Sequence, residues 1–296
     1  MNKLLKNLEE ESLNIIQRTL NDSKNPVVMY SIGKDSSVLL HLFRKVFFPS
    51  KVPVTFLHID TGWKFKEMIK FRDMIASKYD LNFKVYKNPI GEKENITPFN
   101  HSKYTEILKT EALKHSLNAG KYDFVYGGAR RDEEKSRAKE RVLSHRDKNH
   151  VWDPKKQRIE PWYLFNTTKA DGESFRVFPL SNWTELNIWQ YIKHENIQIV
   201  PLYFSKKRKV VHRRNQLFLL DDDRFEINSK DEVKIEEVRF RTLGCYPLTA
   251  ASHSKANSID KIIAELKQTS YSERSTRLID NDKEGSMELK KKEGYF

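Results

Sequence analysis

The stretch of this chain whose residue types are best suited to chemistry is SIGKDSS, residues 31–37. It follows an apolar run, residues 27–30, that has the length of a buried strand and is too short for a helix. Apolar residues at helical spacing come next, at residues 38–43. A helix N-terminus presents backbone N–H groups and partial positive charge, and small hydroxyl side chains with a glycine complete a phosphate site. The sequence therefore predicts phosphate binding at the first strand-to-helix turn.

Two common phosphate motifs do not fit this stretch. A Walker A loop has a second upstream glycine and a Ser or Thr after its lysine, whereas Asp35 follows Lys34. The G-x-G-x-x-G turn of dinucleotide-binding folds is also absent. The stretch instead resembles the pyrophosphate loop of ATP-pyrophosphatases, S-G-G-x-D-S, which holds the β and γ phosphates while the bond between the α and β phosphates breaks. Ile32 replaces the first glycine, as in the S-x-G-K-D-S loop of the sulfonucleotide branch. A polar turn with a serine cap is the structural alternative.

Strand and helix patterns alternate along the first half of the chain. Strands are predicted at residues 27–30, 54–59, 83–86 and 122–126, and helices at residues 1–20, 38–43, 64–79 and 104–117. Residues 88–102 contain Pro89, Gly91 and Pro98 and are expected to form a loop. This alternation predicts an α/β fold with a doubly wound, mostly parallel sheet, in which ligands bind beyond the carboxyl ends of the strands.

Three polar features follow predicted strands and are therefore expected to converge. They are the loop at residues 31–37, Asp60, and the pair Gly127 and Gly128. Asp60 is suited either to a ribose, an adenine amine or Mg²⁺, or to capping the next helix. His58, inside a strand, is interpreted as structural, and Trp63 suits adenine stacking and core packing equally.

A second distinctive stretch is GGARRDEEKSRAKER, residues 127–141. Its glycines allow the backbone to approach a ligand closely, and the planar fork of arginine suits tetrahedral oxyanions. Arg130 and Arg131, next to the glycines, are expected to face the site. The alternative is a solvated helix with pairs such as Glu133–Arg137.

Composition and charge narrow the class of protein further. The chain has 296 residues and a formal net charge of +13, concentrated in residues 130–158 and 205–214, which favours anionic ligands or an acidic partner. For residues 205–214, solubility is the simpler interpretation. We expect neither a signal peptide nor a membrane span, because no apolar run approaches the necessary length. The single cysteine, Cys245, excludes an internal disulfide and fits a reducing cytoplasm.

An ordered set of motifs extends the likeness over most of the chain. From about residue 8 to the C-terminus it resembles the small, ATP-binding subunits of bacterial sulfate adenylyltransferases, although residues 205–214 and 225–233 fit poorly. The motifs are SIGKDSSVLLHLFRK, LHIDTGWKFKEM, FRDMIA, GGARRDEEKSRAKER, VWDPKKQR, RVFPLSNWTELNIWQYI, LDDDR, VRFRTLGCYPLT and GSMELKKKEGYF.

The resemblance implies a fold, a reaction and a partner. The fold is the adenine-nucleotide alpha-hydrolase (HUP-like, PP-loop) type, and the reaction is ATP plus sulfate giving adenosine 5′-phosphosulfate and diphosphate. GTP hydrolysis in a separate large GTPase subunit drives it. Residues 1–200 are expected to form the nucleotide-binding domain and residues 201–296 an irregular C-terminal extension that meets this partner. No membrane or nucleic-acid partner is expected.

Sulfate is already a dianion at neutral pH and requires no general base, so catalysis is expected to be positioning plus charge neutralisation. On the resemblance, Mg²⁺ accompanies ATP, with Asp35 the acidic residue nearest to it. The implied catalytic residues are Lys34, Arg130 and Arg131; the implied sulfate-binding residues are Arg130, Arg131 and Lys135; the implied ATP-binding residues are Ser31, Ile32, Gly33, Lys34, Asp35, Ser36, Ser37, Asp60, Gly127 and Gly128.

Three other functions remain open at this point. A phosphosulfate reductase shares the fold but requires a reactive cysteine, and Cys245 lies among apolar neighbours that suit a buried, inert thiol. A tRNA-modifying adenylase requires an RNA module or a persulfide cysteine. A nucleotide-binding regulatory subunit has no turnover of its own.

Overall fold

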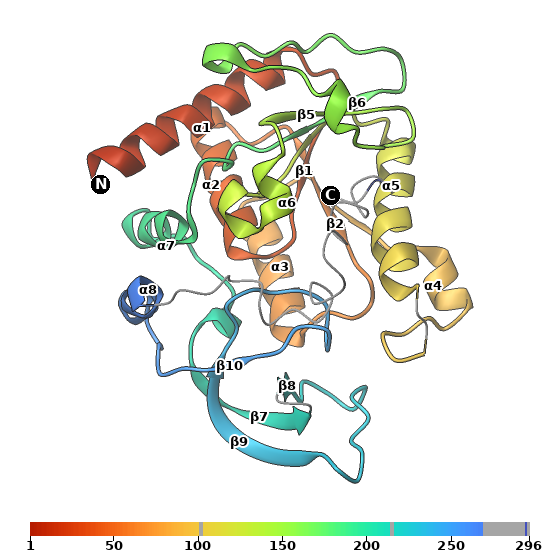
Figure 1. Ribbon diagram of the computed structural model, residues 1–296, viewed down its shortest axis with the longest axis vertical. Helices are drawn as coiled ribbons and strands as arrows, with labels where there is room; N and C mark the ends of the chain where they lie inside the picture. The colour runs from red at the N-terminus through yellow and green to blue at the C-terminus, as the bar shows by residue number, and fades with distance from the viewer. Residues whose placement is uncertain (101–102, 214–215, 269–293, 295–296) are drawn as a thin grey trace.

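The computed structural model describes residues 1–100, 103–213, 216–268 and 294 (Figure 1). A six-stranded sheet in the order β3-β2-β1-β4-β6-β5 lies at its centre. Every neighbouring pair is parallel except β5, which is antiparallel to β6. The predicted doubly wound, mostly parallel sheet is therefore confirmed. Its strands are β1 (Pro26–Met29), β2 (Thr55–Ile59), β3 (Phe83–Tyr86), β4 (Phe124–Tyr126), β5 (Leu143–Arg146) and β6 (Ser174–Val177).

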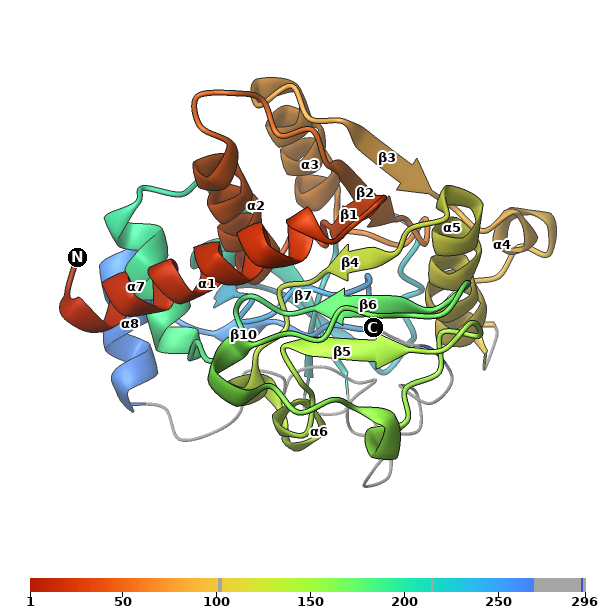
Figure 2. The ribbon, with the colours of Figure 1, turned by 90° about the horizontal axis from the view of Figure 1, so that it is seen from above.

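Helices cover both faces of this sheet. Figure 2 shows α1 and α2 on one side and α5 on the other, and each side has its own apolar cluster. The α-helices are α1 (Lys3–Asn21), α2 (Lys34–Phe47), α3 (Lys66–Lys78), α4 (Pro89–Lys93), α5 (Ala112–Gly120), α6 (Lys135–Ala138), α7 (Glu185–His194) and α8 (Ile259–Gln268). The other helices are the π-helix η1 (Glu106–Glu111) and the 3-10 helices η2 (Arg131–Glu133), η3 (Pro154–Lys156), η4 (Pro161–Tyr163) and η5 (Pro201–Tyr203).

Two helical segments differ from the sequence expectation. The expected loop at residues 88–102 contains α4, because the side chain of Asn88 accepts a hydrogen bond from the Ile90 N–H and Pro89 occupies the first helical turn. The expected continuous helix at residues 104–117 begins instead as η1, with π geometry, and runs directly into α5. Residues 101 and 102 lie outside the described part of the chain.

A second, antiparallel sheet follows η5. Its order is β10-β9-β7-β8, with β7 (Lys206–Arg213), β8 (Gln216–Leu219), β9 (Glu232–Arg239) and β10 (Ser252–His253). The basic strand β7 lies opposite acidic β9, so that Lys207 faces Glu237 and Arg208 faces Glu236. Opposite charges across two strands stabilise their pairing. The expectation of an irregular extension was wrong here, because the charge run at residues 205–214 has its counterpart about 25 residues later.

The second sheet packs against the first part of the chain. Arg208 is buried and forms an ion pair with Glu67 of α3. The rings of Phe65 and Phe240 lie 4.9 Å apart, within one apolar cluster that includes residues of both sheets. The division at residue 200 into two domains stays a prediction.

The sequence tail, residues 285–296, lies outside the described residues except for Gly294. None of the helices in the described ranges combines the length and apolar character that crossing a bilayer requires.

Candidate active site

The loop at residues 31–37 joins β1 to α2 as predicted. Gly33 is the N-cap of α2, and its carbonyl accepts hydrogen bonds from the hydroxyls of Ser36 and Ser37, both at 3.0 Å. Ile32 has φ +69° and a fully buried side chain. A β-branched residue in that region is strained by about 1–3 kcal/mol. The loop thus keeps the shape that a glycine gives in the ATP-pyrophosphatase motif, at an energetic cost.

A cavity of about 250 Å³ opens beside this loop, at the carboxyl ends of β1, β2 and β4. Its lining includes seven of the sequence-predicted residues: Ser31, Gly33, Lys34, Asp35, Ser36, Gly127 and Gly128. The other lining residues are Met29, Tyr30, Leu57, His58, Ile59, Lys64, Lys109, Leu113, Ala129, Glu133, Arg137, Tyr203, Thr242, Leu243 and Gly244. We call residues 31–37 with Gly127 and Gly128 the loop wall. Ile32 and Ser37 shape this wall from behind and do not line the cavity.

A chain of ion pairs fixes the charges of the loop wall. The Lys34 ammonium, with a side chain 2% exposed, lies 3.2 Å from Oδ2 of Asp35. Oδ1 of Asp35 accepts a 2.7 Å hydrogen bond from Nε of Arg130, whose side chain is fully buried. Arg130 also contacts Asp132 and Glu133. Arg130 therefore holds the first turn of α2 in place through Asp35, and it is not part of the cavity lining.

Gly128 is required by its close approach to the loop. A Cβ atom there would lie 3.0 Å from the carbonyl carbon of Asp35 and 3.2 Å from the backbone nitrogen of Ser36. Because these are backbone atoms at a helix start, neither has room to move. By contrast, a Cβ on Gly33 would meet only ordinary contacts, at 3.4 Å or more.

Two other predicted sulfate ligands have different placements. The Arg131 guanidinium donates to the carbonyl of Glu140 and to Oδ1 of Asn182, and Asn182 in turn donates to Glu11 of α1. Arg131 thus points toward α1 and does not line the cavity. Lys135 begins α6, and its side chain is outside the described part of the structure.

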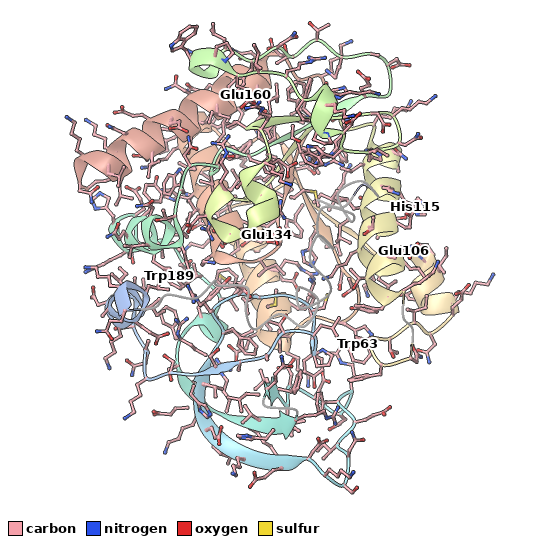
Figure 3. The ribbon with its side chains drawn as sticks, viewed as in Figure 1. Trp63, Glu106, His115, Glu134, Glu160 and Trp189 are labelled. Atoms are coloured by element: carbon pink, nitrogen blue, oxygen red, sulfur yellow. The ribbon has the colours of Figure 1, made fainter. Side chains whose placement is uncertain are left out.

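Asp60 and Trp63 also lie outside the cavity lining. Oδ1 of Asp60 accepts a 2.8 Å hydrogen bond from the Gly62 N–H, and Oδ2 lies 3.6 Å from Arg72. Asp60 thus orders the turn after β2. Trp63, labelled in Figure 3, stacks on Tyr246 with ring centroids 6.3 Å apart. Both side chains therefore contact residues outside the cavity and do not line it.

Sequence reasoning missed the opposite side of the cavity, which we call the lysine wall: Lys64, Lys109 and residues 242–244. Lys64 follows β2, Lys109 belongs to η1, and residues 242–244 follow β9. Cys245 comes next, fully buried, with its sulfur 3.8 Å from the Lys64 ammonium. Its neighbours are thus not only apolar, as the sequence suggested. Burial alone would raise the pKa of the Cys245 thiol, but the positive charges of Lys109 and Lys64 outweigh it and lower this pKa to about 6.

His58 lines the cavity with a neutral ring. Its Nδ1 lies 2.8 Å from the carbonyl oxygen of Tyr30, which fixes Nδ1 as the protonated nitrogen. Burial, with the nearby Lys64 charge, lowers the pKa of His58 to about 3. The interpretation of His58 as a structural residue agrees with this hydrogen bond.

Two further lining residues, Tyr203 and Arg137, come from different segments of the chain. The Tyr203 hydroxyl accepts a 2.9 Å hydrogen bond from the backbone N–H of Lys34, so η5 closes over the loop. Arg137 of α6 lies 3.7 Å from Glu133 and 3.5 Å from Glu134. Arg137 belongs to the stretch at residues 127–141. Only the fold shows that it lines the cavity, whereas Arg130 and Arg131 do not.

The fold and the loop together define a class, that of nucleotide-binding α/β proteins with a pyrophosphate-type loop. The family described as "Phosphoadenosine phosphosulfate reductase domain" matches residues 25–251. A crystal structure of Candida glabrata FMN adenylyltransferase with FMN and the ATP analogue AMPCPP superposes with a TM-score of 0.50. It is 16% identical and covers 93% of this chain and 90% of that one. This likeness concerns the fold alone.

Curated relatives give the finer assignment. Sulfate adenylyltransferase subunit 2 of Aliivibrio fischeri is 58% identical over 99% of this chain and 97% of its own length. The protein of that name from Aeromonas hydrophila is 60% identical over the same shares. The chain belongs to the sulfate adenylyltransferase subunit 2 family, a family of adenylyltransferase enzymes.

Proposed function

We propose that this chain catalyses the transfer of the adenylyl group of ATP to sulfate, giving adenosine 5′-phosphosulfate and diphosphate. The observation that carries the proposal is the cavity at the N-terminus of α2, where Ser31, Lys34 and Ser36 line a space for a polyphosphate. Membership of the sulfate adenylyltransferase subunit 2 family supports the choice of sulfate as acceptor.

The proposed binding mode of ATP follows from the chemistry of the cavity lining. Its β and γ phosphates lie on the loop wall, near Lys34, Ser31 and Ser36. The adenine ring takes the apolar part of the lining, formed by Met29, Leu57 and Leu113. We assign Arg130 a supporting role, because its ion pair with Asp35 sets the shape of the loop. The assignment of sulfate to Arg130, Arg131 and Lys135 stays a prediction, and the sequence alone supports it for Lys135; the contacts of Arg130 and Arg131 do not favour it.

The chemistry is an in-line displacement. A sulfate oxygen bonds to the α-phosphorus while the bond from that phosphorus to the bridging oxygen breaks, and diphosphate leaves with the electron pair. Sulfate brings no proton, so no base acts. The residues lower the barrier by fixing two anions in line and neutralising the charge that moves to diphosphate.

Mg²⁺ enters with ATP as part of the substrate. Among the described residues, no three His, Cys, Asp or Glu side chains are grouped as a metal site. Asp35, the carboxylate of the loop itself, is already held by Lys34 and Arg130. This donor set fits a metal held mainly by phosphate oxygens, as is usual for Mg²⁺ bound to a nucleotide.

The proposed partner is a large GTPase subunit that drives the uphill reaction. The relatives are named as a second subunit, which implies a partner for them, and the resemblance supplies its GTPase character. A cytoplasmic location likewise stays a prediction.

The test is diphosphate and adenosine 5′-phosphosulfate formation by the chain with its co-purified partner, in ATP with and without sulfate. We expect both products in equal amounts, dependent on sulfate and stimulated by GTP. Diphosphate release without sulfate would contradict the proposal. Release of sulfite from adenosine 5′-phosphosulfate, lost in Cys245→Ala, would favour the reductase, which the lowered pKa of this thiol and the match to the phosphoadenosine phosphosulfate reductase domain family support.

A further inference from the structure

Two lysines of the cavity have no role in the binding mode described above. Lys64 and Lys109 are both half-buried and both line the cavity, although they are 45 residues apart in the chain. Both act on the same thiol, since each lowers the pKa of Cys245. The Lys64 ammonium lies 3.8 Å from the sulfur of Cys245, and Cys245 packs in one apolar cluster with Leu108, the residue before Lys109. The two lysines therefore border the same part of the cavity.

The position of Lys109 depends on the π-helix η1. π-helical turns are rare and occur frequently at functional sites. Here the π geometry spans Glu106–Glu111 and then changes to α geometry in α5. In the sequence, Lys109 lies between Glu106 of η1 and His115 of α5. Figure 3 shows these two labelled residues on the other side of the molecule from Glu134, which precedes α6. Because η1 runs into α5, which packs on the face of the sheet opposite α2, Lys109 lines the cavity from the side of η1.

The charges of the lining are distributed unevenly. Among the residues that the structure describes, four of those lining the cavity are cations, Lys34, Lys64, Lys109 and Arg137, and two are carboxylates, Asp35 and Glu133. Both carboxylates belong to the side of the loop wall, where they pair with Lys34, Arg130 and Arg137. The positive charge on the opposite side of the cavity comes from Lys64 and Lys109, and it favours a compact anion there.

We propose that Lys64 and Lys109 form the subsite for sulfate, the tetrahedral dianion that attacks ATP. This inference rests on the proposed function. In-line displacement requires the entering oxygen to approach the α-phosphorus from the side opposite the leaving diphosphate. With diphosphate on the loop wall, that side is the lysine wall. The two ammonium groups hold the dianion there, offset part of its repulsion by the triphosphate, and take no proton from it.

Cys245 reports on this subsite without taking part in the reaction. Its neighbours with titratable or hydroxyl groups are Thr61, Lys64, Tyr104 and Lys109. A dianion between the lysines would offset the positive charge that favours the thiolate. Sulfate should therefore raise the pKa of the thiol.

The first experiment measures sulfate-dependent exchange of labelled diphosphate into ATP by the complex with its partner, for Lys64→Ala and Lys109→Ala. The matched control is Lys66→Ala, an exposed lysine two residues from Lys64. We expect the KM for sulfate to rise about ten- to a hundredfold in the first two variants, as for the loss of a hydrogen bond to a charged group, with the KM for ATP within about twofold of wild type. An unchanged KM for sulfate, or an equal rise for ATP, would overturn the proposal.

The second experiment needs no variant in the subsite. The far-ultraviolet absorbance of the Cys245 thiolate is measured against pH as the difference between the wild-type chain and Cys245→Ala, with and without sodium sulfate, at constant ionic strength set with sodium chloride. We expect sulfate to shift the midpoint upward; an identical profile would refute the subsite. If the wild-type complex makes no adenosine 5′-phosphosulfate at all, the proposed function fails, whereas normal synthesis with unaltered lysine variants refutes only this inference.

Discussion

The two walls of the cavity are built in opposite ways. The loop wall comes mainly from seven consecutive residues, and its proposed phosphate-binding groups lie at the start of α2, with the buried Lys34 among them. The lysine wall combines the segment after β2, the π-helix η1 and the segment after β9. A local motif is sufficient to form a phosphate cradle, because one turn of chain supplies all its donors. A second anion on the far side requires cations brought together from distant segments.

Substitution of Arg130 should have the largest effect on stability. It tests whether the loop wall depends on the ion pair between Arg130 and Asp35. Arg130→Ala leaves Asp35 without the partner 2.7 Å away in a buried position. Breaking a buried pair costs about 3–5 kcal/mol. Urea unfolding should show this decrease, and Arg131→Ala, whose partners lie away from the cavity, should show a smaller one. Equal losses in the two variants would mean that Arg130 has no special link to the loop.

Filling the space at Gly128 should disrupt the loop wall itself. Gly128→Val places side-chain atoms against the backbone of Asp35 and Ser36, which we expect to cost about 1–3 kcal/mol by overpacking and to weaken ATP binding. Isothermal titration with a non-hydrolysable ATP analogue and thermal unfolding measure the two effects. Gly33→Ala is the stability control, since its Cβ has room; a melting temperature as low as that of Gly128→Val would contradict the steric argument.

Removal of the Lys34 charge should lower kcat/KM for ATP more than it changes the requirement for sulfate. Lys34→Ala keeps the Arg130–Asp35 pair but removes the charge beside the diphosphate. We expect kcat/KM for ATP to fall about a hundredfold, as for the loss of a charge-assisted contact worth about 3 kcal/mol, and the sulfate requirement to change less. Steady-state kinetics of the complex measure this. Unaltered kinetics would remove Lys34 from the site.

The pH dependence of the unfolding free energy should show how the lysine wall acts on Cys245. The expected change per pH unit is the smallest of the effects predicted here. The pKa of Cys245 is about 6 in the folded chain against an ordinary value of 9.0, so the thiolate stabilises the fold above pH 9. That contribution declines as the pH falls toward 6, by about 1.4 kcal/mol per pH unit. The unfolding free energies of wild type and Cys245→Ala should therefore converge between pH 9 and pH 6. A difference independent of pH would show that the lysines do not act on the thiol.

Most of the sheet could be predicted from the sequence, because its strands are short apolar runs that alternate with amphipathic helices. The strand at residues 83–86 agrees residue by residue with the structure. The pairing of β7 with β9 was missed, because opposite charges as far apart in the sequence as Lys207 and Glu237 give no periodic signal. In the site, the loop and the two glycines lie together as the sequence predicted. The role of Arg130 stays a prediction, because an arginine beside a glycine has the same local pattern whether it faces a ligand or, as here, a carboxylate.

The sequence by itself determined the nucleotide-binding loop, the class of fold and the family. Those features depend on neighbouring residues, whose backbone conformation and spacing set the donors of a strand-to-helix turn. Only the tertiary structure decided which cations reach the cavity. Lys64 and Lys109 have no distinguishing local context, and their common position follows from the packing of the strand ends, the π-helix and the returning C-terminal segment around Cys245. Electrostatic fields depend on distances in space, and those distances exist only after the chain has folded.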